Sequence, residues 1–197
     1  MVERTVRTEF GVGMSIALVK AVSAIEESGP LHLARLMLIL LQAHRRAKKS
    51  VDGITKLAKI DFLLRYPTCL ERTLAALGKD PEKADVQEFE RTTIESKMVR
   101  FRYGPWDDRY RQWIGLLVAQ GLVDTYVEGR TVHVVLTDAG RAVAEEFEAS
   151  EEYGDLARRS KLIYRTVGSK SGTWLKDFVY RTFPEIVNMK WGDPIDL

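Results

Sequence analysis

The sequence predicts a mainly α protein: a winged-helix domain with one β-hairpin wing and appended C-terminal helices. Three successive segments between residues 106 and 148 lead to this prediction. The first has the apolar periodicity of an amphipathic helix, and the second has two short β-branched runs around a glycine turn. The third begins with a helix-capping threonine. Helix, hairpin and helix in this order form the second half of a winged-helix domain.

The amphipathic helix repeats large apolar residues at steps of three and four, which places them on one face. These residues are Trp106, Tyr110, Trp113, Ile114, Leu117 and Val118. Gly121 ends the helix, because glycine tolerates the positive φ of a C-terminal cap. We expect Trp106 and Trp113 to be core residues that tie this helix to the wing and to the helix over 31–41.

The wing is predicted over residues 122–127 and 131–136, which are short and rich in β-branched side chains. Between these two strands, Gly129 is the glycine of a hairpin turn over 128–130. Thr137 then caps a helix whose body covers 141–148.

Helical patterns before this region predict helices over 14–27, 31–47, 50–65 and 68–77. The second is apolar on nearly all sides in its first part, so we expect it at the centre of the domain. Ser50 is the expected N-cap of the third helix, and Pro67 separates the third from the fourth. Residues 95–102 are consistent with an extended edge segment that leads to a turn at Gly104 and Pro105.

Two further helices are predicted over 155–166 and 173–182. The chain therefore divides into a winged-helix-containing helical domain over 1–150 and a C-terminal helical extension with a docking tail over 151–197. The tail carries much apolar surface for a free segment, which is typical of a contact surface. The expected partner contacts are Arg100, Arg102, Ile186, Met189 and Trp191. For Trp174 and Phe178, packing into the chain's own core is a nearly equal alternative.

Composition describes an ordinary globular protein, with 197 residues of which 45% are hydrophobic and 29% charged. Cys69 is the one cysteine, so no internal disulfide can form, and a cytoplasmic setting fits best. No signal peptide or membrane-spanning run is recognisable. The net charge of +2 neither requires nor excludes nucleic acid as a partner.

The residues expected of an enzyme are missing. There is no glycine-rich phosphate loop followed by Lys and Ser or Thr, so the chain is not itself a P-loop ATPase. One cysteine and three scattered histidines give no zinc spacing. Asp107 and Asp108 are adjacent and point in different directions on a helix, so they suit its N-terminal charge better than catalysis. We therefore expect no catalytic activity and no cofactor.

A run of basic residues offers a nucleic-acid contact as one interpretation. It consists of Arg45, Arg46, Lys48 and Lys49, together with Lys56 and Lys59. A solvated helix end explains the same residues equally well. In the helix before the wing, Asp107 and Asp108 would repel phosphate, and the wing tip offers Arg130 alone as a cation. The residues thus favour protein contacts over sequence-specific DNA reading.

Three motifs carry a resemblance to a known family. They are Lys-Ile-Asp-Phe-Leu-Leu-Arg-Tyr-Pro over 59–67, Glu-Ser-Lys-Met-Val-Arg-Phe-Arg-Tyr-Gly-Pro-Trp-Asp over 95–107, and Phe-Pro-Glu-Ile-Val over 183–187 with Trp191-Gly192. From about residue 31 onward, the chain resembles the middle components of bacterial ABC-three-component systems, including the small middle subunit of Lamassu-type defence complexes. The Arg-Tyr-Gly-Pro-Trp core is the distinctive part, whereas the wing pattern is shared by many winged-helix regulators.

The resemblance implies a small adaptor between an SMC-like ATPase and an effector subunit such as a nuclease. The partners would hydrolyse ATP and act on nucleic acid, and the chain would meet DNA through the complex. The family offers no catalytic residues to carry over. The alternative is a free-standing winged-helix transcriptional regulator that dimerises on a palindromic operator. Such a regulator needs cations where this chain has Asp107 and Asp108.

Overall fold

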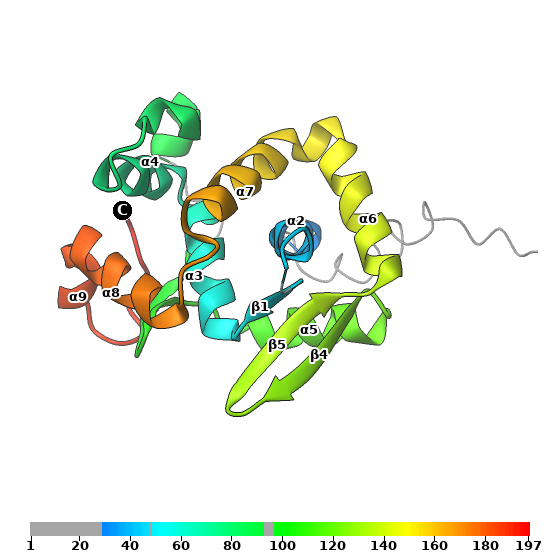
Figure 1. Ribbon diagram of the computed structural model, residues 1–197. Helices are drawn as coiled ribbons and strands as arrows, with labels where there is room; N and C mark the ends of the chain where they lie inside the picture. Colours follow the sequence, from blue (N-terminus) through cyan, green and yellow to red (C-terminus); the bar gives the residue numbers. More distant parts are fainter. Residues whose placement is uncertain (1–28, 48, 93–96) are drawn as a thin grey trace, which may run out of the picture.

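The computed structural model describes residues 29–47, 49–92 and 97–197, which form a mainly helical molecule with two small antiparallel sheets (Figure 1). The helices are α2 Gly29–His44, α3 Ile54–Arg65, α4 Pro67–Ala76, α5 Tyr110–Ala119, α6 Asp138–Ala149, α7 Gly154–Val167, α8 Gly172–Thr182 and α9 Pro184–Asn188. Short 3-10 turns occupy Pro81–Ala84, Glu88–Arg91 and Glu151–Tyr153. The strands are β1 Ser50–Asp52, β2 Val99–Phe101, β3 Gly104–Trp106, β4 Val123–Glu128 and β5 Thr131–Leu136. The helix predicted over 14–27 lies outside the described residues.

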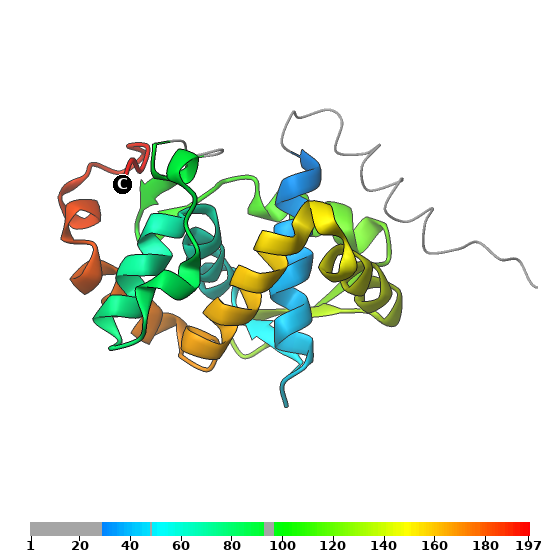
Figure 2. The ribbon, with the colours of Figure 1, turned by 90° about the horizontal axis from the view of Figure 1, so that it is seen from above.

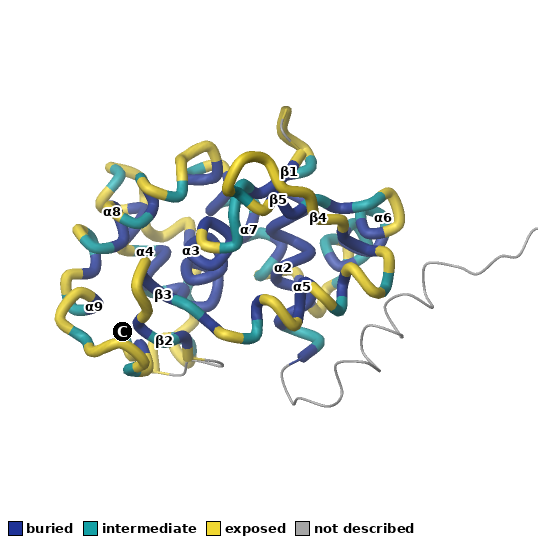
Figure 3. Tube along the Cα trace, turned by 90° about the horizontal axis from the view of Figure 1, so that it is seen from below, coloured by how far each residue is buried: buried dark blue, intermediate teal, exposed yellow. Residues whose placement is uncertain are grey.

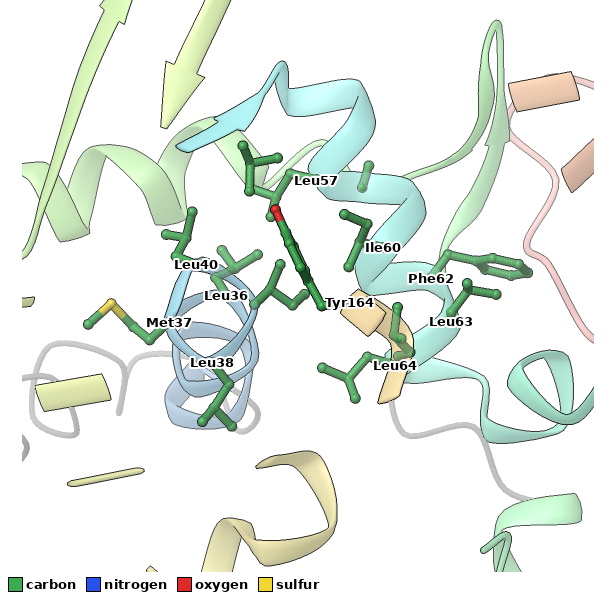
Figure 4. Close-up of a cluster of buried hydrophobic side chains, with 14 of the residues drawn as sticks. Leu36, Met37, Leu38, Leu40, Leu57, Ile60, Phe62, Leu63, Leu64 and Tyr164 are labelled. Atoms are coloured by element: carbon green, nitrogen blue, oxygen red, sulfur yellow. The ribbon is translucent and has the colours of Figure 1, made fainter. Parts of the chain in front are cut away.

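Helix α2 lies at the centre of the molecule, as its apolar sequence predicts. Figure 1 looks along α2 and shows α3, α6, α7 and the sheet around it. Its leucines meet those of α3 in one hydrophobic cluster, with the ring of Tyr164 from α7 between them (Figure 4). A helix surrounded on all sides buries nearly all of its residues, so most of α2 is apolar and its buried polar residues His32, Arg35 and Gln42 are exceptions.

The predicted hairpin forms and projects from the body of the molecule (Figure 1). Strands β4 and β5 pair from Val123 opposite Leu136 to Glu128 opposite Thr131. Gly129 has a φ of 61° in the turn. The hydroxyl of Thr137 accepts the backbone N–H of Gly140 at 2.9 Å, so the predicted cap of the following helix is confirmed.

A third strand, β1, was not predicted from the sequence. It pairs with β5 and gives the order β1-β5-β4. Ser50 therefore begins a strand, and the prediction that it caps a helix is wrong. The helix begins at Ile54, after Gly53 with a φ of 102°. The strand satisfies backbone groups along the edge of β5 and buries Val51, which a longer helix would not do.

Helix α5 begins later than its apolar periodicity predicts. Trp106 belongs to β3, which pairs with β2, and it is only half-buried, so its assignment to the helical stripe is wrong. Val118 is exposed rather than part of the buried face. Gly104 and Pro105 lie within β3, and the hairpin turns at Arg102 and Tyr103 instead.

The helices after residue 150 complete the same core rather than forming a second one. Buried residues of α7 and α8, such as Ile163 and Val179, join the cluster built by α2 and α3. Figure 2 shows α7 crossing α2, and Figure 3 shows that the buried part of the chain continues from α2 and α3 into α8. Among the described residues, no helix is long and apolar enough to cross a membrane.

The C-terminal tail pairs with strand β2 on the side opposite β3. The N–H of Arg100 donates to the carbonyl of Asp193 at 2.8 Å, and the N–H of Ile195 donates to Met98 at 2.8 Å. The side chain of Ile195 is fully buried. The tail is therefore fixed to the chain's own hairpin, and Figure 3 shows the chain end beside β2.

Candidate interaction sites

The described basic residues at the end of α2, Arg45, Arg46 and Lys49, are exposed, but Arg45 forms an ion pair. Arg45 donates to both carboxylate oxygens of Glu148, at 2.7 and 2.8 Å. These bonds lower the pKa of Glu148 to about 2. Arg46 and Lys49 are exposed next to this pair, and Lys48 lies outside the described residues. Among the described residues of this basic patch, the charge of Arg45 is therefore neutralised by Glu148.

Lys56 and Lys59 are not exposed beside Arg46 and Lys49. Both are buried on α3, because α3 is packed between α7, α8 and the β2–β3 hairpin. Lys59 lines a pocket that Arg46 and Lys49 do not line, so its assignment to a phosphate-facing patch with them is wrong. The sequence of α3 alternates cations with leucine and isoleucine, which is typical of a helix with one face in solvent. The pattern does not show that other elements cover both faces of α3.

Lys56 instead lines a basic pocket of about 340 Å³ between the end of α2, β1 and the end of α7. Arg46 and Arg165 are its other cations, and Asp52 is its carboxylate. Three cations against one carboxylate make the pocket suited to a phosphate-sized anion. Sequence reasoning missed Arg165, because α7 is far from α2 along the chain.

A buried ionic network joins α2, α3 and the start of α5. The carboxylate of Asp61 accepts from Arg35 Nε at 3.0 Å, from Arg65 Nε at 2.8 Å and from the Tyr110 hydroxyl at 2.6 Å. Burial alone would raise the pKa of Asp61, but the two arginines outweigh it and lower the pKa. The charges of the network are paired across α2, α3 and α5, although Arg65 Nη2 is buried without a hydrogen-bond partner.

Asp107 belongs to this network and does not face solvent. It accepts from Arg65 Nη1 at 2.8 Å and from Arg109 Nη2 at 3.0 Å. Burial favours its neutral form, but hydrogen bonds from Arg109 and Arg65 lower its pKa to about 2. The expected phosphate repulsion by Asp107 is therefore wrong. Asp108 is exposed and accepts the indole N–H of Trp106 at 2.9 Å.

Trp113 is a core residue, as predicted. Only 2% of it is exposed, and its ring stacks on His32 of α2 with centroids 4.3 Å apart. The guanidinium groups of Arg65 and Arg109 lie 5.2 and 4.9 Å from its ring centroid. Trp113 thus ties α5 to α2 and packs against the ionic network.

Two of the residues predicted to contact a partner are used inside the chain. Arg100 is buried and donates from Nε to the carbonyl of Ile186 at 3.0 Å. Ile186 is fully buried between the tail and α8. The prediction that these two side chains face a partner is therefore wrong. Met189 is half-buried, whereas Arg102 is exposed.

Trp191 remains on the surface, with 65% of its area exposed. Its ring lies 6.1 Å from that of Phe101, and Phe101 in turn lies 6.2 Å from Trp106. Tyr103 at the hairpin turn is also exposed. We call this group the aromatic surface: Phe101, Tyr103, Trp106 and Trp191. Large apolar rings left in solvent at one place are typical of a contact surface.

Beneath the aromatic surface is an apolar pocket of about 200 Å³. It lies between the N-terminal part of α3, the β2–β3 hairpin and α5. Its lining consists of Thr55, Lys59, Phe101, Tyr103, Gly104, Pro105, Trp106 and Arg111. The pocket therefore combines stacking surfaces with two cations, a combination that sequence reasoning missed because it attributed Lys59 to another surface.

The described residues show no arrangement for metal-dependent or thiol chemistry. Within 29–47, 49–92 and 97–197, no group of three His, Cys, Asp or Glu side chains is placed to hold a metal ion. Cys69 is buried, and burial raises the pKa of its thiol to about 12. A thiol of that kind is a poor nucleophile at neutral pH.

Comparisons with family models, with curated proteins and with solved structures found no match for this chain. The candidate sites therefore rest on the chain's own geometry.

Proposed function

We propose that the chain is a non-catalytic adaptor that links an SMC-like ATPase to an effector such as a nuclease in a bacterial defence complex. The observation that carries the proposal is the aromatic surface at the hairpin and tail. Phe101, Tyr103 and Trp191 are exposed together there, although the chain has a large core that buries many other apolar side chains. The three sequence motifs of the resemblance contribute to this surface or to the elements beneath it.

We also propose that α2, α3, α5 and the three-stranded sheet constitute a winged-helix domain. In support, α5 leads through Gly121 directly into the β4–β5 hairpin, and β1 between α2 and α3 completes the sheet. The place of the recognition helix falls to α5.

The outer face of α5 suits a protein partner better than base edges. Its exposed residues include Arg111, Gln112, Gly115, Val118 and Ala119. One cation and three small or apolar side chains offer few contacts to phosphate or base edges. Val127 is 70% exposed beside the wing turn, which adds apolar rather than basic surface.

The test is purification of the tagged chain from its native host, with mass spectrometry of the proteins that accompany it. The proposal predicts an ATPase of the SMC class and an effector subunit in stoichiometric amounts. The purified chain alone should hydrolyse neither ATP nor nucleic acid. A chain that purifies alone, or with its own ATPase activity after contaminants are removed, would contradict the proposal.

A transcriptional regulator remains the second candidate because of the position of Asp107. Its carboxylate is buried and paired with Arg65 and Arg109, so it does not oppose phosphate at the start of α5. A footprint on one palindromic sequence that persists at moderate salt would favour this candidate.

A further inference from the structure

Lys59 is a buried cation without a buried anion. Only 2% of the residue is exposed. Its ammonium donates to the carbonyl of Thr55 at 2.9 Å, and within the described residues no carboxylate lies at ion-pair distance. Lys176, which also acts on it electrostatically, has the same sign. A buried ammonium costs several kcal/mol unless a counter-charge and hydrogen bonds compensate it.

The same residue lines the apolar pocket. Phe101, Tyr103 and Trp106 supply aromatic walls. Gly104, with a φ of 110°, has no side chain, and a Cβ there would come within 4.0 Å of Lys59 Cε. Arg111 adds a second cation from α5. The hydrogen bond from Trp106 to Asp108 fixes the orientation of one wall.

We propose that this pocket binds a carboxylate carried by a peptide segment of a partner protein. The carboxylate pairs with the Lys59 ammonium, and an adjoining apolar side chain packs against Phe101 and Trp106. This inference rests on the proposed adaptor function and specifies its partner as an acidic segment with an apolar anchor.

The charge and shape of the site both favour such a ligand. A carboxylate supplies the missing counter-charge to Lys59, and the two amine protons not used by Thr55 are available to it. Burial, reinforced by Lys176, lowers the pKa of Lys59 to about 8, so the amine is still largely protonated at neutral pH. The aromatic surface continues from Phe101 to Trp191, so a ligand longer than the pocket finds further rings to cover.

The test uses the full-length chain and two synthetic dipeptides, N-acetyl-Phe-Glu-amide and N-acetyl-Phe-Gln-amide. Binding is followed by tryptophan fluorescence, to which Trp106 contributes from the pocket wall. A charge-assisted hydrogen bond predicts that the Glu peptide binds at least about tenfold more tightly than the Gln peptide. The variant Lys59→Met should lose most of this preference, because Arg111 is then the one cation left among the described residues of the pocket lining. Equal binding of the two peptides to the wild type would overturn the proposal.

The matched control is Lys176→Met, which removes a nearby cation that does not line the pocket and should keep the preference for Glu. Arg111→Gln removes the second, exposed cation and should reduce the preference only in part. If phenylacetate binds as tightly as the Glu peptide, the site takes a free small carboxylate and the peptide assignment is wrong. No partner protein is present in this assay, so its failure is distinguishable from failure of the adaptor function.

Discussion

Helix α3 carries two kinds of buried charge, and they have opposite consequences. Asp61 and Arg65 are paired with each other and with neighbours on α2 and α5, so removing one partner leaves an isolated buried charge. Lys59 lies on the side toward the hairpin and has one backbone acceptor among the described residues. In the first arrangement the paired charges offset each other's burial, whereas the second costs stability that a bound anion would restore.

The pH dependence of stability should report this cost. The folded pKa of Lys59 is about 8 and its ordinary value is 10.5. Between these values the folded chain has released a proton that the unfolded chain keeps, so the free energy of unfolding rises with pH. The expected gain between pH 8 and 10.5 is about 3 kcal/mol relative to Lys59→Met. Urea denaturation of both proteins across this range measures it, and parallel curves would contradict a buried cationic Lys59.

Trp113 gives a second prediction at the scale of one residue. Its ring fills the space between α2 and α5 and stacks on His32. Replacing Trp113 by Ala should lower the free energy of unfolding by roughly 3–5 kcal/mol, the usual cost of emptying a buried aromatic site. Chemical denaturation measures the change. A loss below about 1 kcal/mol would mean that the tryptophan is not packed as described.

At the scale of elements, the sequence correctly predicted those helix ends and turns that depend on a single residue. Gly121, Gly129, Thr137 and Pro67 each end or begin an element through their own backbone or side-chain chemistry, and each is found in that role. Strand β1 is three residues long, and it exists because β5 offers an edge far along the sequence. Pairing of that kind leaves no periodic signal in a segment of three residues.

Trp106 shows how a correct pattern can give a wrong element. Its spacing from Tyr110 and Trp113 fits a helix, but the pairing of β3 with β2 holds Trp106 in a strand. The partner contacts predicted at Arg100 and Ile186 failed for a related reason. Arg100 and Ile186 contact each other because the tail packs against β2. The sequence does not predict that the tail packs there.

The tail supplies a prediction at this scale, because Trp191 is exposed and Ile195 is buried. Trp191→Ala should leave the midpoint of thermal unfolding nearly unchanged, since the ring is mostly in solvent. Ile195→Ala should destabilise the chain by about 2–5 kcal/mol, since the side chain is fully buried beside Met98. Equal effects of the two substitutions would mean that the tail does not dock as described.

At the scale of the molecule, the basic pocket and the aromatic surface both combine segments far apart in sequence. Arg46 and Arg165 line the same pocket because α7 packs against α2. The rings of Phe101 and Trp191 are neighbours because the tail pairs with β2. The residue types were therefore readable from the sequence, but their grouping was not. The position of Trp191 after the last predicted helix indicated that its side chain is exposed, as the structure shows. No sequence pattern indicated the pocket at Lys59.

DNA binding by the isolated chain should be weak, independent of sequence and sensitive to salt. Arg46 and Lys49 are the exposed cations beside the Arg45–Glu148 pair. Changing both to Gln should lower affinity and reduce the slope of log affinity against log salt by about 2. Lys190→Gln, an exposed lysine on the tail, serves as the control and should change neither. An unchanged slope in the double variant would exclude the basic patch as the contact.

Quantitative co-purification of one variant tests the central claim most directly. The double substitution Phe101→Ala/Trp191→Ala removes the exposed centre of the aromatic surface, and the control Phe89→Ala removes an exposed apolar ring on the 3-10 turn Glu88–Arg91. The adaptor account predicts that the first variant folds but no longer retains the ATPase or the effector. The second variant should retain both. Full retention of both partners by the double variant, with its unfolding midpoint unchanged, would contradict the account.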